Sequence, residues 1–420
     1  MAAPTAPSAG TGPLTGAFPN PFQSPELRAN PYPLYARLRA ANPVFQVPLP
    51  FEGPGVVILT RHADVEAVLR DGRVTVDRLQ ADVAQRFRAF LPPQFLGDDG
   101  LLRSMLLLDG ADHTRVRGLV NKAFTPRRVG ALEGHIRGIL DELLAAVAGD
   151  GQMDLMHDLA EPLPAIVIAE LLGVPSGDHR QFKEWAAQLV NALGEGGPLA
   201  RGPGFDGAFA SLTDYLREVI EERRKAPGDD LISGMIAAQQ DRDALSDSEL
   251  LANSLLLLLA GHETTTNLIG NGVVALLRNR EQWRRLLADR SLLPNAIEEL
   301  LRYDSPVQAT VRVPTEDLPL GEHVLRKGAL VVCLIGAANR DPAAYEEPDR
   351  LDVTRERVQH LSFGFGQHFC LGAGLARLEA RLVFGALLER APGLALESDS
   401  VEYRPNPLLR GPRTLPVSLA

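Results

Sequence analysis

The stretch of sequence that says most about this chain is Phe363-Gly364-Phe365-Gly366-Gln367-His368-Phe369-Cys370-Leu371-Gly372-Ala373-Gly374-Leu375-Ala376-Arg377. It presents one cysteine, Cys370, from a glycine-rich loop at the start of an apolar helix. Glycine permits backbone angles and close contacts that residues with a Cβ resist, as when a flat cofactor lies against the main chain. A thiolate at a helix N-terminus is also stabilised by the free N–H groups and the helix dipole. Cys370 is therefore the residue whose chemistry has to be explained.

Composition limits the class of protein. The chain has 420 residues, and its formal net charge of -10 argues against nonspecific binding to nucleic acid or to an anionic membrane. Its two cysteines, Cys333 and Cys370, are too few for a disulfide framework, an iron–sulfur cluster or a paired zinc knuckle. We expect a reducing, cytoplasmic setting. No apolar run reaches the roughly 18 residues that span a bilayer, so we expect a soluble protein without membrane insertion.

The pattern of apolar residues predicts a mainly α-helical protein with small, peripheral β-sheets. Residues 1–19 are rich in small residues and proline without a signal-peptide pattern, which indicates a disordered tail. Residues 20–420 then form a single large domain, with helical periodicity dominating from about residue 113 to 302. The predicted strands are short, at 55–60, 309–313, 329–335 and 413–419. The loops 77–104 and 194–207 are the expected mobile lids.

One predicted helix is unusually long. It starts with a capping box from Ser246 to Glu249 and continues to about Arg278, which is about 33 residues or about 50 Å. Its apolar centre means that it passes through the core. The middle reads Ala260-Gly261-His262-Glu263-Thr264-Thr265-Thr266, and polar groups there are costly unless they are hydrogen-bonded or functional. A hydrogen-bonded polar kink is the alternative.

Two residue pairs are weaker signals. Glu299 and Arg302, at i and i+3, share one helix face, but such pairs are common on protein surfaces. His113 and Arg117, at i and i+4, could grip an anionic group together, although each residue type taken alone is more often a surface residue. Cys333, in an apolar strand, is interpreted as a small buried hydrophobe.

Together these motifs resemble the cytochromes P450, especially soluble bacterial members, over nearly all of the chain from about Asn20. The stretch 363–372 is similar to the haem-binding loop of that family, and residues 260–265 to its oxygen-activating helix. Glu299-Leu300-Leu301-Arg302 is similar to its E-x-x-R motif, and Ala338-Asn339-Arg340-Asp341-Pro342 to a segment common in bacterial members. The resemblance implies the cytochrome P450 fold and a haem-thiolate monooxygenase. Such an enzyme inserts one atom of O2 into a hydrophobic small molecule by hydroxylation or epoxidation.

The resemblance also implies a role for each matching residue. Cys370 is expected to be the axial ligand of the iron of haem b (iron protoporphyrin IX), with a thiolate that favours O–O cleavage. Glu263 and Thr264 are expected to supply protons for that cleavage. The expected cofactor contacts are His113, Arg117, Arg312 and His368 at the propionates, together with Ala260, Gly261, Phe363 and Gly364. Glu299, Arg302 and Arg340 are expected to be structural and locked together beneath the haem. The expected walls of an apolar substrate pocket include Leu256, Val307 and Ala309.

We expect no flavin or nicotinamide domain after the haem domain, and therefore expect electrons from separate proteins. The resemblance suggests a ferredoxin and its ferredoxin reductase, docking near Cys370, where Arg115, Lys122 and Arg128 could oppose an acidic partner. One alternative is a non-catalytic haem-binding or sensor protein of the same fold, which would have no use for Glu263 and Thr264. Another is a cysteine hydrolase, but His368 is too close to Cys370 in the chain to act as its base at a useful angle. The sequence does not identify the substrate.

Overall fold

The computed structural model describes residues 24–47, 52–86, 103–178, 181, 184–185, 188, 205–239, 245–406 and 408–419. The predicted disordered tail, residues 1–19, lies outside the described residues. So do residues 87–102 and 194–204, which make up most of the two predicted lids.

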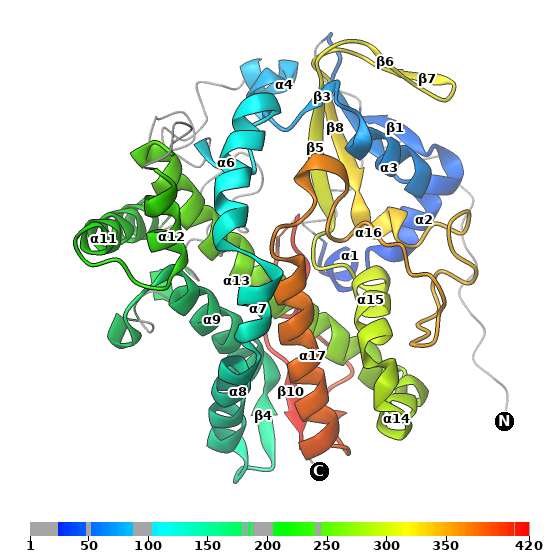
Figure 1. Ribbon diagram of the computed structural model, residues 1–420. Coiled ribbons are helices and arrows are strands. Elements are labelled where there is room, and N and C mark those ends of the chain that lie inside the picture. Colours follow the sequence, from blue (N-terminus) through cyan, green and yellow to red (C-terminus); the bar gives the residue numbers. More distant parts are fainter. Residues whose placement is uncertain are drawn as a thin grey trace, which may run out of the picture.

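Helices make up most of the described chain (Figure 1). They are α1 (Pro25–Ala29), α2 (Tyr32–Ala41), α3 (His62–Arg70), α4 (Asp82–Arg86), α6 (Gly110–Ala123), α7 (Pro126–Ala131), α8 (Glu133–Val147), α9 (Pro162–Leu172), α11 (Phe205–Lys225), α12 (Leu231–Ala238), α13 (Asp247–Arg278), α14 (Arg280–Ala288), α15 (Leu293–Tyr303), α16 (Ile335–Ala338) and α17 (Ala373–Arg390). Short helical turns are η1 (Arg78–Gln80), η4 (Met156–Ala160), η5 (Ser176–Asp178), η6 (Arg290–Leu292) and η7 (Gly366–His368).

The strands are β1 (Val44–Val47), β2 (Val56–Leu59), β3 (Val74–Thr75), β4 (Gln152–Asp154), β5 (Ala309–Pro314), β6 (Leu318–Leu320), β7 (His323–Leu325), β8 (Leu330–Leu334), β9 (Ala395–Leu396) and β10 (Pro416–Ser418). The largest sheet has the order β1-β2-β8-β5-β3, and it lies to one side of the helical body (Figure 1). Within it β2 and β8 are parallel, and the other neighbouring pairs are antiparallel. A mainly helical fold with small sheets at its periphery is therefore confirmed.

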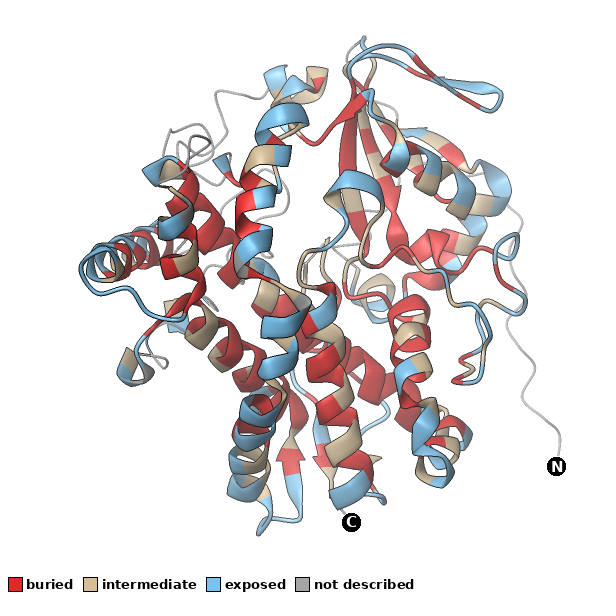
Figure 2. Cartoon of the chain, viewed as in Figure 1, coloured by how far each residue is buried: buried red, intermediate tan, exposed pale blue. Residues whose placement is uncertain are grey.

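Helix α13 is the central element of the core. Its capping box is formed, because Ser246 accepts a hydrogen bond from the Glu249 N–H and the Glu249 carboxylate accepts one from the Ser246 N–H. It runs for 32 residues, close to the predicted length. Helices α9, α11, α15 and α17 pack on it. Figure 2 shows the buried positions gathered on the inward faces of the helices and the exposed positions along their outer faces.

The centre of α13 carries one interruption in this burial. Ala260 is exposed, and Gly261 and Thr264 are half-buried, although the helix is buried on both sides of this short stretch. Since these residues lie within one turn, they leave one side of the helix open at mid-length. Among the described residues, no helix is both long and apolar enough to cross a membrane.

Candidate active site

The loop before α17 is shaped by two glycines and closed by backbone hydrogen bonds. Gly364 and Gly366 have φ angles of 70° and 73°, in the left-handed region that favours glycine. The Cys370 N–H donates to the Phe363 carbonyl oxygen at 2.9 Å, and the Phe369 N–H donates to that of Gly366 at 3.1 Å. A Cβ on Gly366 would lie 2.8 Å from the Leu69 carbonyl oxygen, so the loop lies directly against the end of α3.

The two cysteines lie in opposite environments. Cys370 is exposed to solvent, while surrounding protein atoms cover part of its sulfur. This partial burial raises the pKa of the Cys370 thiol, while hydrogen bonds from the backbone N–H groups of Gly372 and Ala373 and the charge of Arg117 lower it. Cys333 is wholly buried in β8, and burial raises its pKa to about 12. The interpretation of Cys333 as a small buried hydrophobe is therefore confirmed.

The side chains expected at the propionates, on α6 and on the cysteine loop, lie close together. The rings of His113 and His368 lie 4.2 Å apart, and Arg117 donates a hydrogen bond to the Phe369 carbonyl oxygen. His368 Nε2 lies 3.2 Å from the carboxylate of Asp109, the residue that precedes α6. Asp109 was not predicted, because the sequence offers no motif that pairs it with a histidine 259 residues away.

His113 is buried, and its Nε2 has no hydrogen-bond partner among the described residues. Burial, together with the charges of His368 and Arg117, lowers its pKa to about 4. The imidazole is therefore neutral at pH 7, beside a guanidinium that stays charged. A buried polar atom without a partner is costly, so the position beside His113 Nε2 is suited to a polar group of a bound molecule.

Glu263 and Thr264 lie side by side at the open centre of α13. The Thr264 hydroxyl donates to the Ala260 carbonyl oxygen at 2.8 Å. Glu263 is buried, and burial raises its pKa to about 7, although the positive charge of Arg404 acts in the opposite direction. Arg404 itself forms an ion pair with Glu161. Glu263 therefore exchanges a proton near neutral pH, which an ordinary carboxylate does not.

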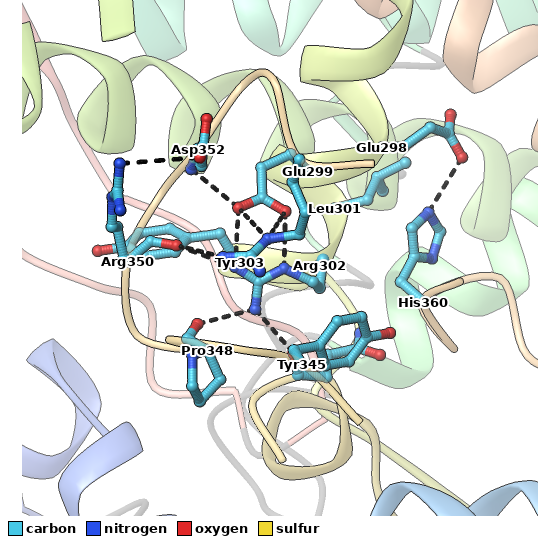
Figure 3. A network of polar contacts seen from close by, with 12 residues as sticks. Glu298, Glu299, Leu301, Arg302, Tyr303, Tyr345, Pro348, Arg350, Asp352 and His360 are labelled. Carbon is cyan, nitrogen blue, oxygen red and sulfur yellow. Dashed lines mark hydrogen bonds and ion pairs between the residues drawn. The ribbon is translucent and has the colours of Figure 1, made fainter. Parts of the chain in front are cut away.

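The E-x-x-R pair is part of a buried polar network (Figure 3). Both side chains are fully buried, and the Arg302 guanidinium donates to the two carboxylate oxygens of Glu299 at 2.7 and 2.8 Å. Arg302 also donates to backbone carbonyl oxygens of a later loop, those of Asn339, Pro348 and Arg350. The pair therefore joins α15 to that loop.

Arg340, which we expect to lock with Glu299 and Arg302, makes its own contacts beside this network. Arg355 belongs to the network, and its Nε donates to Glu299 at 3.2 Å. Arg340 instead donates to the Tyr303 carbonyl oxygen at 2.8 Å, and its guanidinium stacks on the rings of Tyr32 and Tyr303. Arg340 is buried and structural, but it serves a neighbouring contact between α2 and α15. Arg355 lies in an irregular loop where no local pattern distinguishes it from a surface arginine.

Comparison with known proteins decides the family. The profile of the family described as Cytochrome P450 matches residues 198–407. The vitamin D(3) 25-hydroxylase of Pseudonocardia autotrophica is 43% identical over 93% of this chain and 94% of its own. The cytochrome P450 monooxygenase PikC of Streptomyces venezuelae is 41% identical over 93% of this chain and 92% of its own. The solved structure of the Bacillus subtilis polyketide synthase cytochrome P450 PksS has a TM-score of 0.85 and 37% identity, covering 95% of this chain and 99% of that one.

The chain belongs to the cytochrome P450 family. This P450 is a monooxygenase that acts on a small molecule, and the alternative of a non-catalytic haem-binding protein is not favoured. A haem iron with a thiolate ligand is the general property of the family.

The side chains of this P450 fit a haem. Cys370 is an accessible thiol on a loop that has no other metal-binding residue besides His368. The unpartnered Nε2 of His113 and the charged Arg117 suit a propionate carboxylate. On the open side of α13, Ala260 and Gly261 carry nothing larger than a methyl group, and Thr264 lies beside them.

The three predicted pocket residues of this P450 lie in different surroundings. Leu256 lies in the main core cluster with the other apolar residues of α13. Val307 is half-buried and forms an antiparallel bridge with Leu409. Ala309 packs in a small cluster with Tyr32 and Leu334, so its methyl group is already covered.

The predicted docking arginines of this P450 are engaged in ion pairs. Arg115 pairs with Glu249, and Arg128 pairs with Asp229 at 3.0 Å. Lys122 is exposed. Closer to Cys370 along the chain, Arg377 binds Glu298 through two hydrogen bonds of 2.7 and 2.8 Å.

Proposed function

We propose that residues 20–420 of this P450 act as one haem domain, with haem b bound through Cys370, and that it hydroxylates or epoxidises a hydrophobic small molecule. The observation that carries the proposal is the Cys370 thiol, accessible on a glycine loop with the N–H groups of Gly372 and Ala373 directed at its sulfur. Those N–H groups stabilise a thiolate, which is the form that binds iron.

His113, Arg117, Arg312 and His368 hold the two haem propionates in this proposal. His113 supplies a neutral ring with a free Nε2, and Arg117 and Arg312 supply charge that does not titrate. The small residues Ala260 and Gly261 leave room for the flat ring on one side, and Phe363 and Gly364 border it on the cysteine side. The E-x-x-R pair of Glu299 and Arg302 keeps its structural role.

When bound, the haem iron with its thiolate ligand supplies O2 activation and O–O cleavage. Glu263 and Thr264 control protons in the proposed mechanism. Glu263 is half protonated near pH 7, so it can release a proton and take up another during turnover. In this proposal the Thr264 hydroxyl, which donates to the Ala260 carbonyl oxygen, passes that proton into the site. Without this supply, electrons leave as peroxide instead of entering product.

The proposed substrate class is hydrophobic. The relatives include a protein named as a vitamin D(3) 25-hydroxylase, and vitamin D(3) is a largely apolar molecule. Of the three expected pocket residues, Val307 is half-buried and apolar, which agrees with this class, whereas Leu256 and Ala309 are covered by core packing. A panel of sterols, fatty acids, terpenoids and polyketides, screened for a spin-state shift in the haem spectrum, tests it; shifts given only by polar, charged compounds would contradict it.

The proposed electron donors are a ferredoxin and its ferredoxin reductase, and the proposed location is the cytoplasm, where Cys370 stays reduced. Phe369, next to Cys370, is 42% exposed, an unusual exposure for so large an apolar residue. We propose that the partner docks over Phe369 and the basic residues Arg115, Lys122 and Arg128. Its association should weaken as salt is added. Reduction kinetics that do not change with ionic strength would contradict this docking mode.

The experiment that tests the function is the spectrum of the reduced protein under carbon monoxide. We expect a strongly red-shifted Soret band that depends on the Cys370 thiolate. Cys370→Ser should lose the shifted band and the monooxygenase activity, whereas Cys333→Ala, the matched change of the other cysteine, should keep both. Absence of haem in freshly purified, haem-supplied protein, or a retained band in Cys370→Ser, would overturn the proposal.

A further inference from the structure

Arg78 is a cationic residue that belongs to none of the motifs recognised in the sequence. It opens the turn η1, directly after strand β3. In the antiparallel pairing of β3 with β5, Val74 lies opposite Pro314 and Thr75 opposite Val313. Continuing that register by one residue places position 76 opposite Arg312, and η1 itself contacts β5. Arg78 and Arg312 are therefore brought to the same place from distant parts of the sequence.

Neither guanidinium has a carboxylate partner in the described part of the chain. Arg312, with 7% of its surface exposed, donates to the Thr310 hydroxyl at 3.1 Å and to the Val311 carbonyl oxygen at 2.8 Å. Arg78 is exposed to solvent, and within the described ranges its side chain makes no hydrogen bond or ion pair. A buried charge such as that of Arg312 is normally paired, so the missing carboxylate partner of Arg312 is the feature to explain.

Among the described residues, the acidic side chain whose charge acts on Arg312 is Asp109, and its oxygens are already engaged. One oxygen accepts from the Thr75 hydroxyl and from the Val76 N–H at 2.9 Å. The other lies 3.2 Å from His368 Nε2. Asp109 therefore serves β3 and the cysteine loop and cannot also bridge two arginines.

The two arginines repel each other as they stand. Burial lowers the pKa of Arg78, and the positive charge of Arg312 lowers it further. Two like charges held close together repel each other, and an anion between them turns the repulsion into attraction. A carboxylate has two oxygens with lone pairs in one plane, and a guanidinium presents its N–H groups in a matching planar fork.

We propose that Arg78 and Arg312 together bind one carboxylate group that is not part of the chain. The inference rests on the proposed function, since Arg312 is there assigned to a haem propionate. Two sources share this chemistry, a haem propionate and the carboxylate of an acidic substrate. Asp109 links this pair of arginines to His368 in the cysteine loop, and therefore the propionate is the source that the arrangement favours.

The test uses Arg78→Gln, which removes the charge, and Arg78→Lys, which keeps it without the planar fork. Arg73→Gln is the matched control, because Arg73 lies at the other end of β3 in an exposed ion pair with Asp71. Since Arg78 has no partner within the described chain, the haem-free Arg78→Gln protein should unfold at the same denaturant concentration as wild type or a higher one. A structural role for Arg78 would lower that midpoint and would overturn the proposal.

The first measurement is the rate of haem transfer from the ferric protein to excess apomyoglobin. Loss of a hydrogen bond between charged groups should raise the rate in Arg78→Gln about tenfold or more, with a smaller increase in Arg78→Lys and none in Arg73→Gln. After reconstitution with haem dimethyl ester, which lacks the propionate charges, Arg78→Gln should transfer haem as fast as wild type. That pair of results assigns the carboxylate to the propionate.

The second measurement is a spin-state titration with dodecanoic acid and with dodecanol. If Arg78→Gln binds dodecanoic acid about tenfold more weakly, with unchanged affinity for dodecanol and unchanged haem transfer, the carboxylate is assigned to the substrate. If Arg78→Gln changes neither haem transfer nor the ratio of acid to alcohol affinity, the carboxylate site is refuted while the P450 function stands. A wild-type protein that takes up no haem would refute the proposed function instead.

Discussion

Glu299 and Arg302 form a two-fold hydrogen-bonded ion pair, at 2.7 and 2.8 Å, in which neither side chain has any exposed surface. The same four-residue pattern on a protein surface contributes a few tenths of a kcal/mol. Here Asp352 N–H and Arg355 also donate to Glu299, while Arg302 donates to three carbonyl oxygens. Each charge depends on the other, because water cannot replace a lost partner.

We predict that Arg302→Leu lowers the free energy of unfolding by about 3–5 kcal/mol, because it leaves the Glu299 carboxylate buried with its main counter-ion removed. Urea unfolding followed by circular dichroism measures the change. Arg285→Leu is the control, since Arg285 pairs with Glu281 on the surface of α14 and its loss should change stability by less than about 1 kcal/mol. Equal effects of the two substitutions would contradict the role of the buried network.

Glu263 predicts a pH-dependent stability. Its pKa is about 7 in the folded protein and close to the ordinary 4.5 in the unfolded chain. Between these values the folded state binds more protons than the unfolded state, so stability from this group falls as pH rises from about 4.5 to about 7. Glu263→Gln has a side chain that does not ionise, so it lacks this pH-dependent loss of stability.

The stability of Glu263→Gln relative to wild type should therefore increase between pH 5 and pH 8, by on the order of 3 kcal/mol. Denaturant unfolding of the haem-free protein across that range measures it. Glu281→Gln, an exposed change on α14, should show no such trend. A stability difference for Glu263→Gln that is constant with pH would show that Glu263 has an ordinary pKa.

Two glycines of the cysteine region should respond oppositely to alanine. Gly366 has a φ of 73°, and a Cβ there would lie 2.8 Å from the Leu69 carbonyl oxygen, so Gly366→Ala should cost about 1–3 kcal/mol. Gly374, in the first turn of α17, has open space within 4 Å of the point where a Cβ would stand, so Gly374→Ala should be neutral or stabilising by up to about 1 kcal/mol. Thermal unfolding of both variants compares them; similar destabilisation by both would contradict the contact with Leu69.

Thr264→Ala should bind substrate as wild type does but divert electrons into hydrogen peroxide. The reason is that the hydroxyl held on the Ala260 carbonyl oxygen is lost while the backbone of α13 is unchanged. The ratio of product formed to reductant consumed measures the effect. Thr264→Ser, which keeps a hydroxyl, should have most of the wild-type ratio. Unchanged coupling in Thr264→Ala would remove Thr264 from the proton path.

Local patterns were predictable from the sequence. The capping box at Ser246 and Glu249 and the apolar run after it set the start and the burial of α13, because both act within a few residues. The placing of glycines around Cys370 likewise indicated a loop with unusual backbone angles, which Gly364 and Gly366 adopt. The hydrogen bond from Arg355 to Glu299 was not predictable, because nothing local separates one loop arginine from another.

The sequence by itself determined the type of chemistry: a cysteine on a glycine loop and an acid–hydroxyl pair at the centre of a long buried helix, each a pattern of neighbouring residues. Only the tertiary structure decided which side chains complete those patterns. Arg355 reaches Glu299 across 56 residues, and Asp109 reaches His368 across 259. The pKa of Glu263 likewise depends on what buries it, and Arg78 meets Arg312 only through the pairing of β3 with β5. Burial and electrostatic contact act through space, so residue order along the chain does not reveal them.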